Sequence, residues 1–360
     1  MGVEIKLTDK QFPVSAAFIE FLYDRIAGRA PNTAWHDQLS ETMIPADAEK
    51  RRAVAQSVAD KVLAHPLGQN TIYRSYDLLT ALLTGQPAKL RPLHERFRFV
   101  CVVGCPRHGG SYLTKQLFRS LGIDPARVPN EIAHDGFPDA APFSLREQYN
   151  TLTVMTQHMA EYLAMVEVFF ADARRFDGRI VVPKKATKAA YHGAFFNAVL
   201  GPHAEYTITL RHPVAACIST YEKSTGLPAD GRFRVRGNIE EWVRRDNVAT
   251  GADPEAIFQR DYFDVYLRYW EQYHYNLALT GLAANHHWTI VAYGRERMAE
   301  AARRLSRFGD AGAVEEFKVF DHRDRHPAWR RQAEPAVRRV AEVWRSVGLA
   351  FPFDEVMEGW

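Results

Sequence analysis

The pattern of apolar and polar positions changes near residue 95. Before that point apolar residues recur at helical spacing and are interrupted by proline and glycine, which end helices. We expect residues 1–95 to form a helical region that caps the rest of the chain or provides an oligomer surface. The predicted helices cover Val14–Ala27, Ala46–Ala64 and Ile72–Leu83.

After residue 95 the pattern becomes short runs that are almost wholly apolar, each followed by a helix-like segment. Such runs are typical of parallel strands that are buried on both faces between helices. The sequence therefore predicts an α/β domain over residues 96–360, built on a parallel β-sheet flanked by helices. Ligands of such sheets bind beyond the carboxyl ends of the strands. The predicted strands are Phe99–Val103, Ile180–Val182, Tyr206–Leu210 and Trp288–Ala292.

The composition narrows the possible partners. The chain of 360 residues carries 46 basic and 43 acidic residues, and this balance argues against a nucleic-acid-binding protein while leaving room for a local polyanion pocket. We find no secretory signal and no apolar stretch long enough to span a bilayer. The three cysteines, Cys101, Cys105 and Cys217, include no CxxC pair, which favours a reducing, cytoplasmic location.

A glycine-rich segment, Gly104–Ser111, connects the first predicted strand to a helical stretch. This layout aims backbone N–H groups and the positive end of a helix at an anion. The spacing nearly completes a P-loop, but Gly110 stands where the P-loop lysine would reach the β- and γ-phosphates. The segment therefore predicts binding of an anionic group other than a nucleoside triphosphate, with Arg107 as the cation. A tight strand-to-helix connection without a ligand is the structural alternative.

A second candidate anion site follows the strand Tyr206–Leu210. Arg211 ends this strand, Pro213 suits the first turn of a helix, and Ser219 lies eight residues after the arginine. An arginine fork and a neutral hydroxyl donor are a suitable pair for one phosphate. The alternative is a surface arginine with a serine bonded to its own helix backbone.

Together the two motifs resemble those of sulfotransferases that use 3′-phosphoadenosine-5′-phosphosulfate (PAPS). Val103–Leu113 is similar to the 5′-phosphosulfate loop of that family, with His108 in place of a serine and Gly110 in place of a hydroxyl residue. The pair Arg211 and Ser219 has the spacing of the family's 3′-phosphate motif. The resemblance covers residues 99–221 and implies a P-loop-like, three-layer sulfotransferase fold. It implies donor-binding roles for Arg107, His108, Gly109, Gly110, Ser111, Tyr112, Arg211 and Ser219.

The resemblance also implies a reaction. A sulfuryl group would pass in line from PAPS to a hydroxyl, or less readily an amine, of a small-molecule, lipid or carbohydrate acceptor, leaving 3′-phosphoadenosine 5′-phosphate (PAP). We expect Arg107 to neutralise the leaving phosphate, and we expect no metal to be required. A family lysine at the end of the next strand corresponds best to Lys185, with Lys184 as the alternative.

The sequence offers several candidates for the base that removes the proton from the acceptor hydroxyl. Some members of the family use a glutamate shortly after the first helix, and Glu131 fits that position. A carboxylate partly removed from water can acquire a pKa suited to this task. The alternatives are the histidines His108, His134 and His212, of which His108 also belongs to the loop.

Two other functions fit the same motifs. A P-loop kinase for a small molecule would share the strand, turn and helix but lacks its loop lysine here. A non-catalytic PAP-binding protein would explain the unusual His108 and Gly110. The helices of residues 1–95 could in either case support a homo-oligomer.

Overall fold

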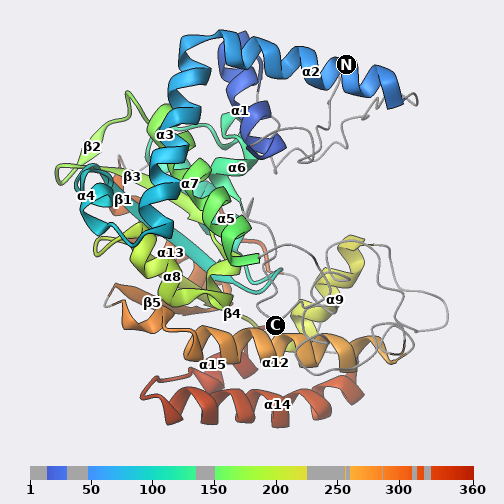
Figure 1. The fold of residues 1–360 in the computed structure, drawn as a ribbon. Coiled ribbons are helices and arrows are strands. Elements are labelled where there is room, and N and C mark those ends of the chain that lie inside the picture. The colour runs from blue at the N-terminus through green and yellow to red at the C-terminus, as the bar shows by residue number, and fades with distance from the viewer. Residues whose placement is uncertain are drawn as a thin grey trace. The chain divides into compact units, whose positions relative to one another are not determined.

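The structure is a computed structural model that describes residues 14–30, 48–134, 151–224, 256, 260–285, 287–309, 314–319 and 326–360 (Figure 1). The chain divides into two compact units. The first comprises residues 1–97, 122–140 and 149–184, and the second comprises 98–121, 141–148 and 185–360. Segments that follow residue 95 in the sequence therefore pack with the N-terminal helices in the first unit.

The first unit is mainly helical. The three helices expected from the sequence are present, and an additional helix, α4, begins at Pro87 because proline is tolerated in a first helical turn. Its strands β2 and β3 form an antiparallel pair. The elements are α1 (Ala16–Ala27), α2 (Ala48–Ala64), α3 (Pro66–Leu83), α4 (Pro87–Arg96), η2 (Pro125–Arg127), α6 (Asn130–Ala133), α7 (Thr151–Phe169), β2 (Arg175–Phe176) and β3 (Arg179–Lys185).

A buried carboxylate joins α1 to α7 in this unit. The Ser15 N–H and hydroxyl donate to Glu161 at 2.9 and 2.5 Å, and the Ser15 oxygen in turn accepts from the Phe18 N–H at 3.3 Å. These bonds satisfy donors that the start of a helix leaves open. They fix the N-terminal end of α1 against α7, and α1 carries several residues of a cavity described below.

The second unit contains three parallel strands in the order β1, β4, β5. Both pairings are parallel, as expected for buried apolar strands, with Val103 opposite Ile208 and Ile208 opposite Ile290. The elements are β1 (Phe97–Gly104), α5 (Gly110–Ser120), η3 (Thr187–Tyr191), α8 (Gly193–Leu200), β4 (Glu205–Leu210), α9 (Pro213–Ser224), α12 (Tyr262–Leu279), η4 (Leu282–Ala284), β5 (Trp288–Ala292), α13 (Arg295–Leu305), η5 (Ser306–Phe308), α14 (Pro327–Ser346) and α15 (Phe353–Met357).

The register of β1 and β4 brings the two sequence motifs to one edge of the sheet. Gly104 at the end of β1 lies opposite Thr209, so the loop that follows β1 and the Arg211 that follows β4 leave the sheet side by side. The α/β class is confirmed: among the described strands, β1 pairs with β4 and β4 with β5 in parallel, and β2 pairs with β3 antiparallel. No helix of the described segments is long and apolar enough to cross a membrane.

Candidate anion-binding site

Glycine is required at the end of β1 because β4 approaches closely there. A Cβ atom on Gly104 would overlap the Thr209 hydroxyl oxygen, which belongs to the opposing strand. The absence of a side chain allows the chain to turn out of the sheet at this point. The turn places the Gly104–Ser111 loop directly above the sheet edge.

The loop reaches α5 through two left-handed positions. Arg107 has φ +68° and Gly109 has φ +87°, and the His108 N–H closes a turn on the Cys105 oxygen at 3.2 Å. Gly109 is the N-cap of α5 and provides no side-chain bond to the first helical N–H groups. The Tyr112 and Leu113 N–H groups donate to the Gly109 main-chain oxygen, so the N–H groups of Gly110 and Ser111, at the positive end of this 11-residue helix, are the ones that suit an anion.

Arg211 is a buried cation at the end of β4. Its side chain is 2% exposed, its Nη1 donates to the Arg107 main-chain oxygen at 3.0 Å, and its guanidinium lies 3.9 Å from the Tyr293 ring centroid. Its Nε and Nη2 atoms have no hydrogen-bond partner in the part of the chain that the structure describes. Burial lowers the pKa of Arg211. A buried guanidinium with two open donors is costly unless an anion satisfies it.

The second arginine connects the two motifs. Arg107 is exposed, and its Nε donates to the Ser219 hydroxyl on α9 at 2.9 Å. Sequence reasoning assigned Arg107 and Ser219 to different phosphates, yet the structure brings their side chains together. Arg211 donates to the main chain of Arg107, so the two arginines and Ser219 form one cluster with two cationic groups.

The position of Lys185 distinguishes it from its neighbour. Its Cε and Cδ atoms lie 3.5 and 3.8 Å from the place of a Cβ on Gly110, so this lysine runs beside the loop. Lys184 instead is 2% exposed, donates to the Glu131 main-chain oxygen at 2.6 Å and lies 4.1 Å from the Tyr162 ring centroid, all within the first unit. The geometry favours Lys185 as the cation of the loop.

His108 lies beneath the loop. It is fully buried, its Nδ1 is 3.1 Å from the Thr209 main-chain oxygen, and its ring stacks on His274 at 5.5 Å. Burial, then the neighbouring His274, hold the pKa of His108 well below the usual range, so the ring is neutral and donates from Nδ1. This placement indicates that His108 anchors the loop to β4. It does not favour His108 as the base that contacts the acceptor substrate.

The other candidate bases differ in their surroundings. The His212 Nδ1 accepts from the Val214 N–H at 3.2 Å at the start of α9, and burial lowers the pKa of His212 to about 3. Glu131 lies in α6 of the first unit, is partly buried, and has a pKa raised to about 7 by burial. His134 is the C-cap of the same short helix. Of Glu131, His108 and His212, Glu131 has the pKa best matched to proton transfer near neutral pH.

A later segment that sequence reasoning missed covers part of the loop. Tyr112 donates to the Glu315 main-chain oxygen at 2.7 Å, and its ring lies 4.7 Å from that of Phe317. Phe317 is buried and lies beside Gly109 and Tyr293. Ser111 in the first turn of α5 stays partly exposed. No motif in the sequence around Phe317 indicated this cover.

The loop glycines allow a matched test of these contacts. A Cβ on Gly109 would force a left-handed alanine and overlap the end of the Met298 side chain, whereas a Cβ on Gly110 would make ordinary contacts. We expect Gly109→Ala to lower the free energy of unfolding by about 1–2 kcal/mol or more. Gly110→Ala should leave it nearly unchanged, and chemical denaturation of the two variants measures both. Equal stabilities would show that the loop path differs from the one described.

Comparison with protein-family models, curated proteins and solved structures gives no match. The functional argument therefore depends on the residues of the site themselves.

Proposed function

We propose that the chain is a PAPS-dependent sulfotransferase whose donor site is the Gly104–Ser111 loop together with Arg211 and Ser219. The observation that carries the proposal is Arg211, a buried guanidinium whose Nε and Nη2 have no partner in the described segments. An anion at this position would satisfy both donors with charge-assisted hydrogen bonds. The open N–H groups of α5 supply a second place for an anion, and PAPS carries anionic groups at its 5′ and 3′ positions.

In this proposal Arg107 changes partner when the donor binds. The Arg107 Nε donates to the Ser219 hydroxyl, and we expect a phosphate oxygen that lies between them to accept from both side chains. In this arrangement Arg107 lies between the two anionic groups of the donor.

The chemistry proposed for the loop is in-line transfer of the sulfuryl group. Negative charge develops on the oxygen that bridges sulfur and phosphorus as the S–O bond breaks. Lys185, which runs beside Gly110, and Arg107 stabilise that charge. The acceptor hydroxyl gives its proton to a base as its oxygen bonds to sulfur. For this base the resemblance to the family offers Glu131, a residue of the first unit whose pKa burial raises to about 7, and that role stays a prediction.

The position of Lys185 also supports the kinase alternative. A lysine from β3 that lies beside Gly110 supplies a cation close to the position of the missing P-loop lysine. Such a lysine could contact the phosphates of a nucleoside triphosphate as well as a phosphosulfate. The two functions therefore have to be separated by the donor that is consumed.

Incubation of the purified chain with a metabolite mixture and sulfur-labelled PAPS separates them. The proposal predicts labelled products and stoichiometric PAP. Transfer of label from γ-labelled ATP with magnesium, and none from PAPS, would replace the proposal with a kinase. PAP binding without transfer from either donor would leave a non-catalytic binding protein.

A further inference from the structure

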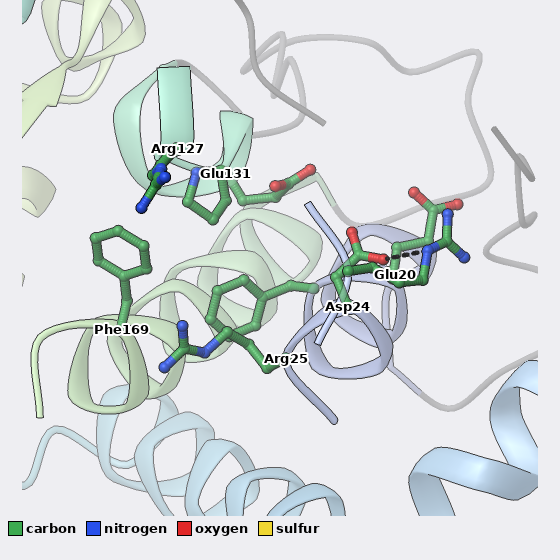
Figure 2. A pocket seen from close by; sticks show the side chains of 9 residues that line it. Glu20, Asp24, Arg25, Arg127, Glu131 and Phe169 are labelled. Atoms are coloured by element: carbon green, nitrogen blue, oxygen red, sulfur yellow. Dashed lines mark ion pairs between the residues drawn. The ribbon is translucent and has the colours of Figure 1, made fainter. Parts of the chain in front are cut away.

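The first unit contains a cavity of its own. It has a volume of about 100 Å³ and lies between α1, the short helices η2 and α6, and the end of α7 (Figure 2). This volume is below the roughly 300–1,000 Å³ of sites for drug-sized ligands, so it suits a molecule of a few heavy atoms. The cavity is lined by Glu20, Phe21, Asp24, Arg25, Arg29, Arg127, Pro129, Glu131 and Phe169.

Carboxylates gather on one side of this cavity. The Glu131 carboxylate makes no hydrogen bond or ion pair to another side chain within the described segments, and the nearby Lys184 donates to the Glu131 main-chain oxygen. Burial, and then Glu20, raise the pKa of Glu131 to about 7, and burial also raises the pKa of Asp24. Asp24 pairs with Arg29 at 3.4 Å. A positively charged group of a ligand would therefore stabilise this side of the cavity.

Guanidinium groups lie on the other side. Figure 2 shows Arg127 and Arg25 beside Phe169, away from the carboxylates of Glu131 and Asp24. Both arginines are exposed, so they can bind an anionic group without a large desolvation cost. The apolar ring of Phe169 lies with these two arginines at the positive side. The cavity thus has a negative side and a positive side.

We propose that this cavity binds a small zwitterion, with its ammonium group at Glu131 and Asp24 and its acid group at Arg127 and Arg25. The charge separation supports this class over a simple anion or a simple amine, because each of those would satisfy only one side. The site is built from residues of the first unit, and it does not depend on the donor site proposed for the second unit.

The proposal includes a dependence on pH. Pairing with an ammonium group requires the ionised form of Glu131, and with a pKa of about 7 this form becomes dominant above neutrality. The affinity should therefore rise between pH 6 and pH 8. The charged and titratable groups around Glu131 are Glu20, Asp24, Arg25 and Arg29 of α1, Arg127 of η2, Lys184 of β3, Tyr162 of α7 and the adjacent His134.

Ligand-observed NMR titration of the full chain tests the site. Taurine and β-alanine serve as zwitterions, and ethylamine and methanesulfonate carry the two charges separately. We expect a zwitterion to bind at least tenfold more tightly than either single-charge compound. Glu131→Gln and Arg127→Gln should each weaken that binding about tenfold or more. Glu95→Gln and Arg91→Gln, exposed on α4 of the same unit and outside the cavity, should leave it unchanged.

The outcomes are distinct. Glu131→Gln should also remove the rise in affinity between pH 6 and pH 8, whereas Arg127→Gln should retain it. Arg127 is exposed, so its variant keeps the test valid even if Glu131→Gln does not fold. If methanesulfonate binds as tightly as the zwitterions, the cavity is an anion site and the proposal is wrong. Zwitterion binding that neither variant changes, or no binding at all, would overturn the proposal. None of these results depends on whether the second unit binds PAP.

Discussion

Replacing Arg211 with methionine is expected to lower the affinity for PAP at least about 100-fold. Two of its guanidinium nitrogens, Nε and Nη2, are buried and have no hydrogen-bond partner among the described residues. A hydrogen bond to a charged group contributes about 1.5–3 kcal/mol, and each 1.4 kcal/mol changes an affinity about tenfold. Two such bonds to one phosphate therefore give an effect of this size. Isothermal titration calorimetry with PAP measures it.

The same substitution should not destabilise the ligand-free protein. A buried guanidinium without an anion costs free energy, and methionine fills similar space against Tyr293 without a charge. We expect the melting temperature of Arg211→Met to equal or exceed that of the original chain. Arg345→Met, an exposed change on α14, is the matched control and should alter neither property. A large loss of stability with unchanged PAP affinity would assign Arg211 to the fold alone.

Replacing Lys185 with alanine is expected to lower kcat for sulfuryl transfer by about 10²–10³-fold. The side chain runs along Gly110, where its ammonium group can meet charge that develops on the bridging oxygen. Removal of one preformed donor to such an oxygen costs about this much in other enzymes. PAP affinity should change less than tenfold, because most of this interaction arises in the transition state. Steady-state kinetics with labelled PAPS and the acceptor found by screening provide the measurement.

Lys188→Ala is the control for this prediction. Lys188 lies three residues further along the chain in η3 and is also partly exposed, but it does not line the loop glycines. Its replacement should leave kcat within a few-fold of the original value. A loss of PAP affinity in Lys185→Ala with unchanged kcat would place Lys185 in ground-state binding instead.

Much of the secondary structure could be predicted because its signals are local. The apolar run at Phe99–Val103 and the glycines after it indicate a strand and a turn without any knowledge of distant residues, and β1 follows this prediction. Helix α4 was missed because Pro87 and Pro92 were interpreted as breakers, although Pro87 occupies a first-turn position. The two-residue strand β2 was too short to leave a pattern.

The division into units and the finer geometry of the site depend on contacts between distant residues. The pattern before residue 95 cannot show that residues 122–140 and 149–184 pack with it. The contact of Arg107 with Ser219 spans 112 positions, and the cover of Gly109 by Phe317 spans more. The contact of Lys185 with the position of Gly110, and the bond of the buried Lys184 to the Glu131 main chain, likewise join distant residues. Spacing along the chain contains none of this information.

The most direct test of the donor site compares PAP with AMP, which lacks the 3′-phosphate. Calorimetric titration of the unmodified chain should show PAP binding at least about 100-fold more tightly than AMP, because only PAP offers an anion to Arg211 while another group occupies the loop. Arg211→Met should reduce this ratio to near one. Equal affinities for PAP and AMP in the unmodified chain would contradict the proposed site.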